Sequence, residues 1–397
     1  MDDILNNRVD MRNKGDWKYV ENSLVLKTPV ICTTLSMAGI SRLDLIRNSV
    51  DYLIVDEACQ AIEPACLIPF NLNPKRVILV GDQKQLPATT FSDNAIESNF
   101  ARSLFERLLQ SGYQKTMLTI QYRMHPLIRQ FPSDKFYHGK ITDGEIVSQR
   151  KLDNEMHTLS TLMRRSIFFD ILSSQEEVRN LSRQNVEETR FTLCLVQFIY
   201  QTVCRGQSFS RCLAGKIAVI TPYKAQVNNL KDAFGPWLRS IGCQLNVIEI
   251  NTVDAFQGRE KDVVIFNCVR SNDIESLQGS LGFCTDVRRL NVAITRPRHF
   301  LFVIGNSETL LKCDTWAYMV YQHRAKQANG GYFALDRDFT SQLCPEMITE
   351  LLYSIDPAPR NQEAQASITE SSALLDKSQF QENASVQKRA CHSIDQQ

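Results

Sequence analysis

Short apolar runs, rich in β-branched residues, recur along the chain and are separated by stretches with helical spacing. The runs do not alternate with polar residues, which is typical of strands buried on both faces of a sheet. The predicted strands are residues 30–32, 52–55, 77–80, 166–170, 217–220, 247–250, 263–266 and 300–304. The predicted helices are residues 103–110, 186–202, 225–234 and 287–293, and the predicted loops are residues 131–133 and 173–185. This alternation predicts an α/β fold with a parallel sheet.

Composition narrows the class of protein. The chain has 397 residues, which suggests two or three domains. Its net charge of +1 argues against an unstructured basic coat for nucleic acid but is compatible with a local basic groove. Twelve cysteines without C-x-x-C or zinc-finger spacing indicate a reducing compartment, either cytosol or nucleus. The first residues are polar and do not have the pattern of a secretory signal peptide, and no apolar run approaches the roughly 18 residues of a membrane span. Residues 356–397 are rich in Gln, Ser, Asn and Ala, a composition that predicts disorder.

Acidic side chains follow two of the predicted strands. Asp56 and Glu57 come directly after residues 52–55, and the loop after residues 77–80 carries Gly81, Asp82 and Gln85. Open α/β sheets bind ligands at the carboxyl ends of their strands, and in a nucleotide hydrolase such acids hold Mg²⁺ and orient the attacking water. One acidic pair alone is more often a solvent-facing cap, but two neighbouring acid-bearing loops favour a site.

Six ordered motifs carry a family resemblance. They are VDEACQ (55–60), GDQKQLPAT (81–89), QYRMHP (121–126), ITPY (220–223), TVDAFQGREKD (252–262) and NVAITRPR (291–298). In this order they resemble the superfamily 1 helicases of the group that contains senataxin and the up-frameshift helicases. The segments CTTLS (32–36), DEACQAIEPACLIPF (56–70) and FPSDKFYHGKITDG (131–144) are similar to the senataxin branch. The resemblance covers residues 29–312 and implies RecA-like domains of the P-loop NTPase fold.

The resemblance also implies catalytic residues for ATP hydrolysis with Mg²⁺. Asp56 would be the Mg²⁺ ligand, Glu57 the hydrolytic base, and Gln85 a contact of the γ-phosphate. Arg123 and Arg296 would be arginine fingers, because a planar guanidinium stabilises the charge that spreads over the transferred phosphoryl group. Taken singly, each arginine is more often a partner in a surface salt bridge.

Three further residues would line the ATP site by the same resemblance. Tyr122 would stack on the adenine, although a buried core tyrosine is an equal alternative. Gly258 and Glu260 would lie at the cleft, and the alternative for Glu260 is a surface ion pair with Lys261 or Arg259.

Hydroxyl-bearing strand ends are the candidate nucleic-acid contacts. The residues implied are Thr33, Thr34, Ser36, Thr221, Pro222, Tyr223 and Thr252. Hydroxyls and main-chain amides suit phosphates, and Pro222 or Tyr223 would stack on a base of a single strand. The alternative is that they are ordinary strand ends. His125 is predicted to be a structural histidine and not a metal ligand.

The sequence departs from the family pattern at its start. The phosphate-binding loop G-x-x-x-x-G-K-[S/T] is absent, since the Gly-Lys pairs at 139–140 and 215–216 are each followed by Ile. We therefore expect an incomplete first RecA-like domain and a complete second one. The expected division is residues 1–28 as an N-terminal remnant, 29–128 as the partial first domain, 129–330 as the second domain, 331–355 as an extension and 356–397 as the tail.

Two hypotheses of function remain. The first is the C-terminal part of an ATP-dependent helicase acting on single-stranded RNA or DNA or on an RNA/DNA hybrid, in the nucleus or alternatively the cytoplasm. The second is an inactive helicase-like protein that binds single-stranded nucleic acid or a protein partner. Under both, the chain by itself is expected to hydrolyse little ATP.

Overall fold

The computed structural model describes residues 14–90, 92–204, 207–271, 282, 286–326, 331–336 and 344–353. Residues 1–349 form one compact unit and residues 350–397 a second. The second contributes only the end of helix α16 (Pro345–Tyr353) to the described residues, and the predicted tail at 356–397 lies outside them. Within the described part of the chain, no helix combines the length and the hydropathy that crossing a membrane requires.

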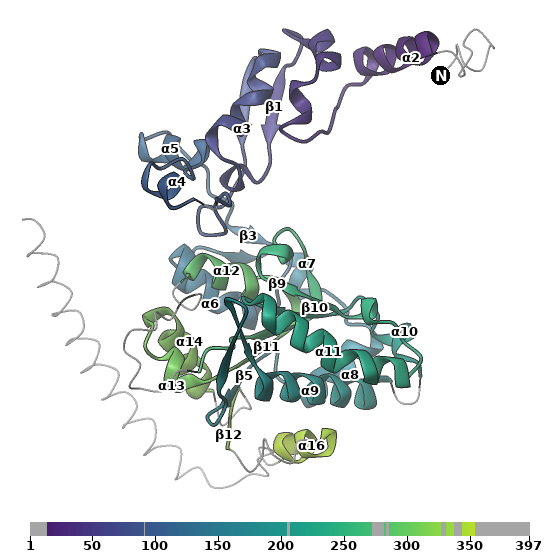
Figure 1. Ribbon diagram of the computed structural model, residues 1–397, viewed down its shortest axis with the longest axis vertical. Coiled ribbons are helices and arrows are strands. Elements are labelled where there is room, and N and C mark those ends of the chain that lie inside the picture. The colour runs from purple at the N-terminus through teal and green to yellow at the C-terminus, as the bar shows by residue number, and fades with distance from the viewer. Residues whose placement is uncertain are drawn as a thin grey trace, which may run out of the picture. The chain divides into compact units, whose positions relative to one another are not determined.

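A six-stranded, all-parallel sheet organises most of the first unit (Figure 1), as the α/β prediction requires. Its strand order is β12-β5-β11-β10-β8-β9. The strands are β5 (Ser166–Ile171), β8 (Ile217–Thr221), β9 (Glu249–Thr252), β10 (Lys261–Asn267), β11 (Pro297–Gly305) and β12 (Tyr332–Leu335). Register pairs Phe266 of β10 with Val303 of β11, and Thr221 of β8 with Thr252 of β9.

Helices cover both faces of this sheet because its side chains alternate between them. On one face Phe168, Phe266 and Val303 pack with α6 (Pro126–Tyr137), α12 (Val287–Ile294) and α14 (Asp314–Arg324). On the other, Phe169 meets Phe191 with ring centroids 4.9 Å apart. Phe191 belongs to α9 (Val186–Cys204), which packs beside α8 (Asn154–Leu162) and α11 (Lys224–Ser240). The central strands are therefore buried on both faces, as their unbroken apolar sequences predict.

The chain before this sheet forms smaller elements. The helices are α2 (Lys14–Lys27), α3 (Glu63–Leu67), α4 (Asp93–Glu97) and α5 (Leu104–Gln110), and the strands are β1 (Tyr52–Val55) and β2 (Arg76–Leu79). The remaining short elements are β3 (Ile120–Gln121), β4 (Thr142–Asp143), α7 (Glu145–Ser148), β6 (Glu176–Arg179), β7 (Ser182–Asn185), α10 (Phe209–Cys212) and α13 (Ser307–Leu310). Short 3₁₀ turns occupy Met37–Gly39, Ser41–Ile46, Ala58–Gln60, Ile68–Leu72, Leu245–Val247 and Asp254–Phe256.

Strands β1 and β2 pair in parallel, with Val55 opposite Leu79, but make a sheet of only two strands. Their outward apolar side chains stay accessible, since Ile54 is 62% exposed and Ile78 44%. A small core of Val55, Ala58, Cys66 and Leu104 lies beneath them. This part of the unit has far less buried apolar surface than the six-stranded sheet.

Several predicted elements are wrong, for identifiable reasons. Residues 30–32 form no strand, and Val30 is 74% exposed with no strand of the described residues beside it. Residues 131–133 lie inside α6, where Phe131 is buried in the core and outweighs the helix-breaking tendency of Pro132. The polar run 173–185 contains the antiparallel hairpin β6–β7, and β9 begins two residues later than expected. The remaining predicted strands and helices are confirmed, with bounds shifted by a few residues.

Candidate functional site

The two acid-bearing loops meet, as the sequence predicts. The main-chain N–H of Ala58 donates to the carbonyl of Val80 at 2.8 Å, which ties the loop after β1 to the end of β2. Asp56 and Glu57 are both exposed there, and the N–H of Glu57 donates to Oδ1 of Asp56 at 3.0 Å. Glu57 has a left-handed backbone with φ of +51°, which turns the chain sharply so that both carboxylates emerge at the strand end.

Close packing explains the glycine of the second loop. A Cβ on Gly81 would lie 2.9 Å from Sγ of Cys59 and 3.1 Å from its main-chain nitrogen, so only glycine fits. The next residue, Asp82, accepts hydrogen bonds from Nε2 of Gln85 and from the N–H of Lys84, each at 2.9 Å. The loop is therefore fixed by its own side chains.

Tyr137 and Asn291 connect this loop to the helices over the six-stranded sheet. The Tyr137 hydroxyl donates to Oδ2 of Asp82 at 2.5 Å, and Nδ2 of Asn291 donates to the same hydroxyl at 2.7 Å and to the carbonyl of Lys84 at 3.0 Å. Burial, followed by the charge of Asp82, raises the pKa of Tyr137, so the hydroxyl stays protonated and can donate.

Arg296 reaches the same loop from the end of α12. It is only 2% exposed, and its guanidinium donates to the carbonyl of Val292 and to Oγ1 of Thr295, each at 2.8 Å. Nη2 also lies 3.4 Å from Oε1 of Gln85. Burial lowers the pKa of Arg296 to about 10, and the nearby Arg123 adds to this. The side chain is therefore still cationic at neutral pH. Its hydrogen bonds go to uncharged oxygens, while the carboxylates of Glu57 and Glu260 lie near enough to favour its charged form.

Arg123 approaches the same place from the loop before α6. Its Nε donates to Oε2 of Glu260 at 2.5 Å and its Nη1 to the carbonyl of Thr295 at 3.2 Å. Glu260 also accepts from Nε of Arg298 at 2.9 Å. Burial opposes ionisation of Glu260, but the hydrogen bonds from the two arginines prevail and lower its pKa. The expected alternative partners of Glu260 are engaged elsewhere, since Lys261 and Arg259 both pair with Glu249.

The other two candidates for the ATP site are open to solvent. Tyr122 is 59% exposed and is not a core tyrosine. Its ring covers Gly144, where a Cβ would lie 2.3 Å from Cε1. Gly258 has φ of +77° with open space around the position of a Cβ. Both residues are therefore accessible to a ligand.

The candidate nucleic-acid contacts divide into two groups. Thr33, Thr34 and Ser36 are exposed but do not end a strand, because the strand expected before them does not form. Thr221 and Thr252 are paired at the ends of adjacent strands, as expected.

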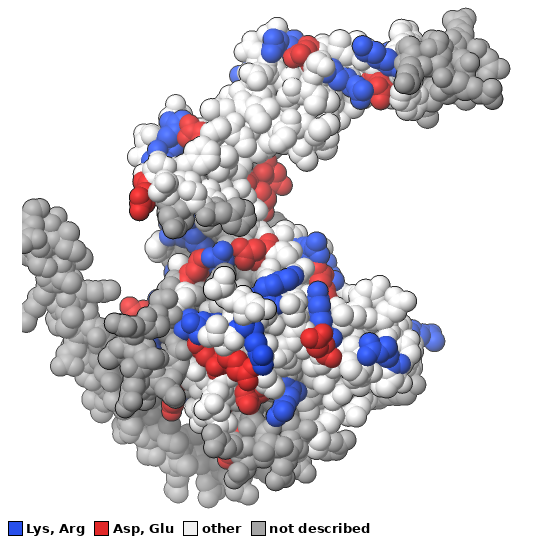
Figure 2. Space-filling model, viewed as in Figure 1, with Lys and Arg blue, Asp and Glu red and all other residues white. Residues whose placement is uncertain are grey.

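Thr221 is itself fully buried, and the residues that follow it are only partly open. Pro222 is half-buried, whereas Tyr223 is only 9% exposed and would have to move to stack on a base. On the face shown in Figure 2, Lys and Arg lie interspersed with Asp and Glu and form no single basic stripe.

Four residues of this site were missed from the sequence: Tyr137, Asn291, Thr295 and Arg298. Asn291, Thr295 and Arg298 lie within the NVAITRPR motif. The one-turn spacing of Asn291 and Thr295 on a helix was a usable signal. Tyr137 lies far from the motifs it joins and had no local signal.

Comparisons with known proteins agree with this geometry. Residues 100–308 match a family described as an AAA domain, and residues 6–93 match a second family with the same description. The first match covers more than half of the chain, which therefore belongs to this family of superfamily 1 helicases. The resemblance to the senataxin and up-frameshift group and the RecA-like α/β fold are thereby confirmed.

Among curated proteins, the chain is 39% identical over 319 residues to "Probable helicase MAGATAMA 3" of Arabidopsis thaliana, covering 79% of this chain and 37% of that protein. It is 35% identical to "Helicase SEN1" of Saccharomyces cerevisiae, covering 79% of this chain and 14% of that protein. It is 34% identical to "Regulator of nonsense transcripts 1" of Dictyostelium discoideum, covering 80% and 23%. The chain thus spans well under half the length of these relatives.

One solved structure, titled "The structure of PRRSV helicase", is similar with a TM-score of 0.30 and 17% identity, covering 66% of this chain and 36% of that one.

Proposed function

We propose that this chain is the C-terminal part of an ATP-dependent helicase that moves on single-stranded nucleic acid. The observation that carries the proposal is the approach of Arg296 to Gln85. A buried cation at the end of α12, whose hydrogen bonds go to uncharged oxygens, lies beside the loop where a γ-phosphate would be sensed. The curated names of its relatives, several of which are helicases, support the same class.

Each candidate catalytic residue would have its own role in ATP hydrolysis. Asp56 is an exposed carboxylate at a strand end, and Mg²⁺ in nucleotide sites takes one or two carboxylates together with phosphates and water, so the residue fits as a ligand. Bound there, the ion would neutralise phosphate charge. Glu57 would take the proton of the attacking water, and Gln85 would contact the γ-phosphate. Arg296 would stabilise charge on the phosphoryl oxygens.

Arg123 would act as the second finger after exchanging partners. In the present arrangement it is bound to Glu260, which Arg298 also holds. Because Glu260 keeps Arg298 when Arg123 leaves, the exchange does not strand an unpaired carboxylate. Tyr122, exposed next to Arg123, would stack on the adenine.

The nucleic-acid path in this proposal runs along the ends of β8 and β9. Pro222 and Thr252, which are partly exposed, would contact the nucleic-acid backbone, which gives binding largely independent of sequence. Thr221 is fully buried and would have to be uncovered before its hydroxyl could take part. Thr33, Thr34 and Ser36 would add exposed hydroxyls from the first part of the unit. The substrates we propose are RNA or an RNA/DNA hybrid, with the nucleus as the site of action and the cytoplasm as the alternative.

A second candidate function follows from one sequence fact. The 397 residues contain no phosphate-binding loop, and each charge-assisted hydrogen bond of such a loop contributes roughly 1.5–3 kcal/mol. A chain without it would bind single-stranded nucleic acid or a protein partner and hydrolyse little ATP. Reading the transcript upstream of Met1 for an in-frame loop motif separates the two candidates.

The biochemical test compares the 397-residue chain with a longer chain that carries a phosphate-binding loop. We expect RNA-stimulated ATP hydrolysis only from the longer chain. In it, Arg296→Gln or Arg123→Gln should lower kcat about 10³-fold, as removal of arginine fingers does. Arg190→Gln, at an exposed position of α9, is the matched control. Robust stimulated turnover by the 397-residue chain, or a loss below about tenfold in either finger variant, would contradict the assigned roles.

A further inference from the structure

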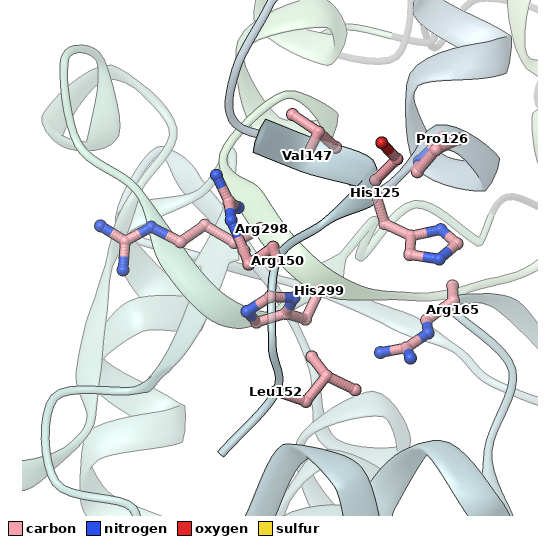
Figure 3. A pocket seen from close by; sticks show the side chains of 9 residues that line it. His125, Pro126, Val147, Arg150, Leu152, Arg165, Arg298 and His299 are labelled. Atoms are coloured by element: carbon pink, nitrogen blue, oxygen red, sulfur yellow. The ribbon is translucent and has the colours of Figure 1, made fainter. Parts of the chain in front are cut away.

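A pocket of about 360 Å³ opens near the start of β11, and no residue of the proposed catalytic set lines it (Figure 3). Its polar lining, apart from Ser148, is Arg150, Arg165, Arg298, His125 and His299. None of the described residues that line it is acidic. Three guanidinium groups therefore surround one hollow, although Arg298 also pairs with Glu260 and Asp262 outside the lining.

Arg298 and Arg150 differ in the partners that they bind. Arg298 is balanced by Glu260 and by Asp262, whose Oδ1 lies 3.3 Å from its Nη1. Arg150 instead donates to main-chain carbonyls, those of Arg123 at 2.7 Å and Tyr122 at 2.5 Å. The neutral carbonyls leave its charge uncompensated.

Arg165 gives the strongest indication that the pocket holds a ligand. Its Nη1 atom is buried and has no hydrogen-bond partner among the described residues, while its guanidinium stacks on the Phe300 ring at 4.7 Å from the centroid. Burial lowers the pKa of Arg165. An orphaned buried donor costs free energy unless a ligand satisfies it.

The two histidines supply neutral donors. Nδ1 of His125 accepts the N–H of Leu127 at 3.2 Å, so the neutral ring carries its proton on Nε2. Burial, with help from Arg165 and His299, lowers the pKa of His125 to about 4, and burial lowers that of His299 as well. Figure 3 shows both rings and the Arg165 guanidinium around the same space.

We propose that this pocket binds a small phosphate-bearing anion at a second site, which shares Arg298 with the candidate nucleotide site but none of its proposed catalytic residues. Guanidinium forks match phosphate oxygens in geometry and charge, and three arginines disfavour a metal cation. The volume of this pocket lies at the lower end of the range for ligand pockets, about 300–1,000 Å³. It is large enough to hold more than a bare phosphate ion. Pro126, Val147 and Leu152 line the rest, so an apolar group attached to the phosphate has a wall to pack on.

A ligand in the pocket would also restrain the loop before α6 that carries Tyr122 and Arg123. Arg150 bonds directly to the main chain of Tyr122 and Arg123, so a ligand that holds Arg150 also holds the backbone that carries both side chains. The source of the anion is either free inorganic phosphate or a phosphomonoester with an apolar group.

Calorimetric titration of the 397-residue chain tests the site and separates the two sources. Inorganic phosphate and phenyl phosphate are the probes, and we expect phenyl phosphate to bind more tightly. Arg165→Met should weaken both by about tenfold or more, through the lost charge-assisted hydrogen bond. Leu152→Trp, which fills the apolar side without removing charge, should weaken phenyl phosphate selectively. The control is Arg164→Met, at the exposed neighbouring position outside the lining, and its affinities should match those of the unmodified chain.

Several outcomes would overturn the proposal. Absence of binding of both probes at about 1 mM, the weakest range expected for a specific site, would do so. Unchanged affinity in Arg165→Met would place any bound phosphate elsewhere. If Arg165→Met does not fold, unchanged phenyl phosphate affinity in Leu152→Trp decides against the site. Displacement of phenyl phosphate by a single-stranded oligonucleotide would assign the pocket to the nucleic-acid path instead. None of these readouts depends on ATP hydrolysis, so the proposed function can fail independently.

Discussion

Removing the hydroxyl of the half-buried Tyr137, by Tyr137→Phe, should loosen the loop that carries Asp82 and Gln85. The hydroxyl donates to Asp82 at 2.5 Å and accepts from Asn291 at 2.7 Å. Phenylalanine keeps the ring and creates no cavity, so the variant isolates these two hydrogen bonds. Because they join α6 and α12 to the loop after β2, their loss should act on that loop before it acts on the six-stranded sheet.

The size of the free-energy loss depends on which other hydrogen bonds Asp82 and Asn291 retain. A hydrogen bond to a charged group contributes about 1.5–3 kcal/mol and a neutral one about 0.5–1.5 kcal/mol. Asp82 retains its bonds from Lys84 and Gln85, and Asn291 retains the carbonyl of Lys84 at 3.0 Å. The expected loss is therefore at the lower end, about 2 kcal/mol, or about 30-fold in an opening equilibrium.

Hydrogen exchange at the Gln85 amide measures this directly, because that N–H donates to the carbonyl of Asp82 at 3.1 Å within the loop. We expect exchange about 30-fold faster in Tyr137→Phe. Tyr321→Phe, at an exposed position of α14, should leave the rate unchanged. A change of less than about twofold at Gln85 would mean that the loop is held by its own contacts alone, and the role assigned to Tyr137 would be wrong.

Three further predictions test the packing and the titration of the unit. Trp316→Ala, which removes a fully buried ring stacked on Phe266 at 6.0 Å, should cost about 3–5 kcal/mol in urea unfolding, and a cost below about 1 kcal/mol would contradict that burial. His323 is buried, and burial lowers its pKa from 6.5 to about 4, so its contribution to stability is complete above about pH 6.5 and is lost as the pH falls toward 4. Because His125 and His299 also have lowered pKa values, they contribute to the same pH dependence. Unfolding measured across that range should therefore show a loss that is about 3 kcal/mol smaller in His323→Gln than in the unmodified chain; an equal slope in the two would exclude a contribution of His323. Limited proteolysis should cut residues 29–120 before the body at 125–330, because β1 and β2 have only each other, and equal protection would show that the small sheet is stabilised in another way.

The fold was predictable wherever hydrophobic pattern alone determines structure. Strands β8, β10 and β11 are buried on both faces, and their unbroken apolar runs predicted them correctly. The same type of run at residues 30–32 failed, because an apolar run becomes a strand only when a neighbouring strand pairs with it. The loop predicted at residues 131–133 was wrong for the opposite reason. Burial of Phe131 and Phe136 holds the chain in helix α6 despite the helix-breaking tendency of Pro132.

Sequence reasoning placed the acid-bearing loops together because parallel strands bring their carboxyl ends to one edge, a rule that needs no knowledge of distant contacts. It could not choose the partner of Glu260, because Lys261 and Arg259 are adjacent in the chain and Arg123 is 137 residues away. The structure shows why the adjacent residues lose: both extend toward Glu249 of β9, whereas Glu260 faces the loop of Arg123 and the start of β11. Under the function proposed above, Glu260 would keep Arg298 while Arg123 moves to a phosphate. The ion pair that looks like a surface salt bridge would then hold Arg123 in place until that exchange.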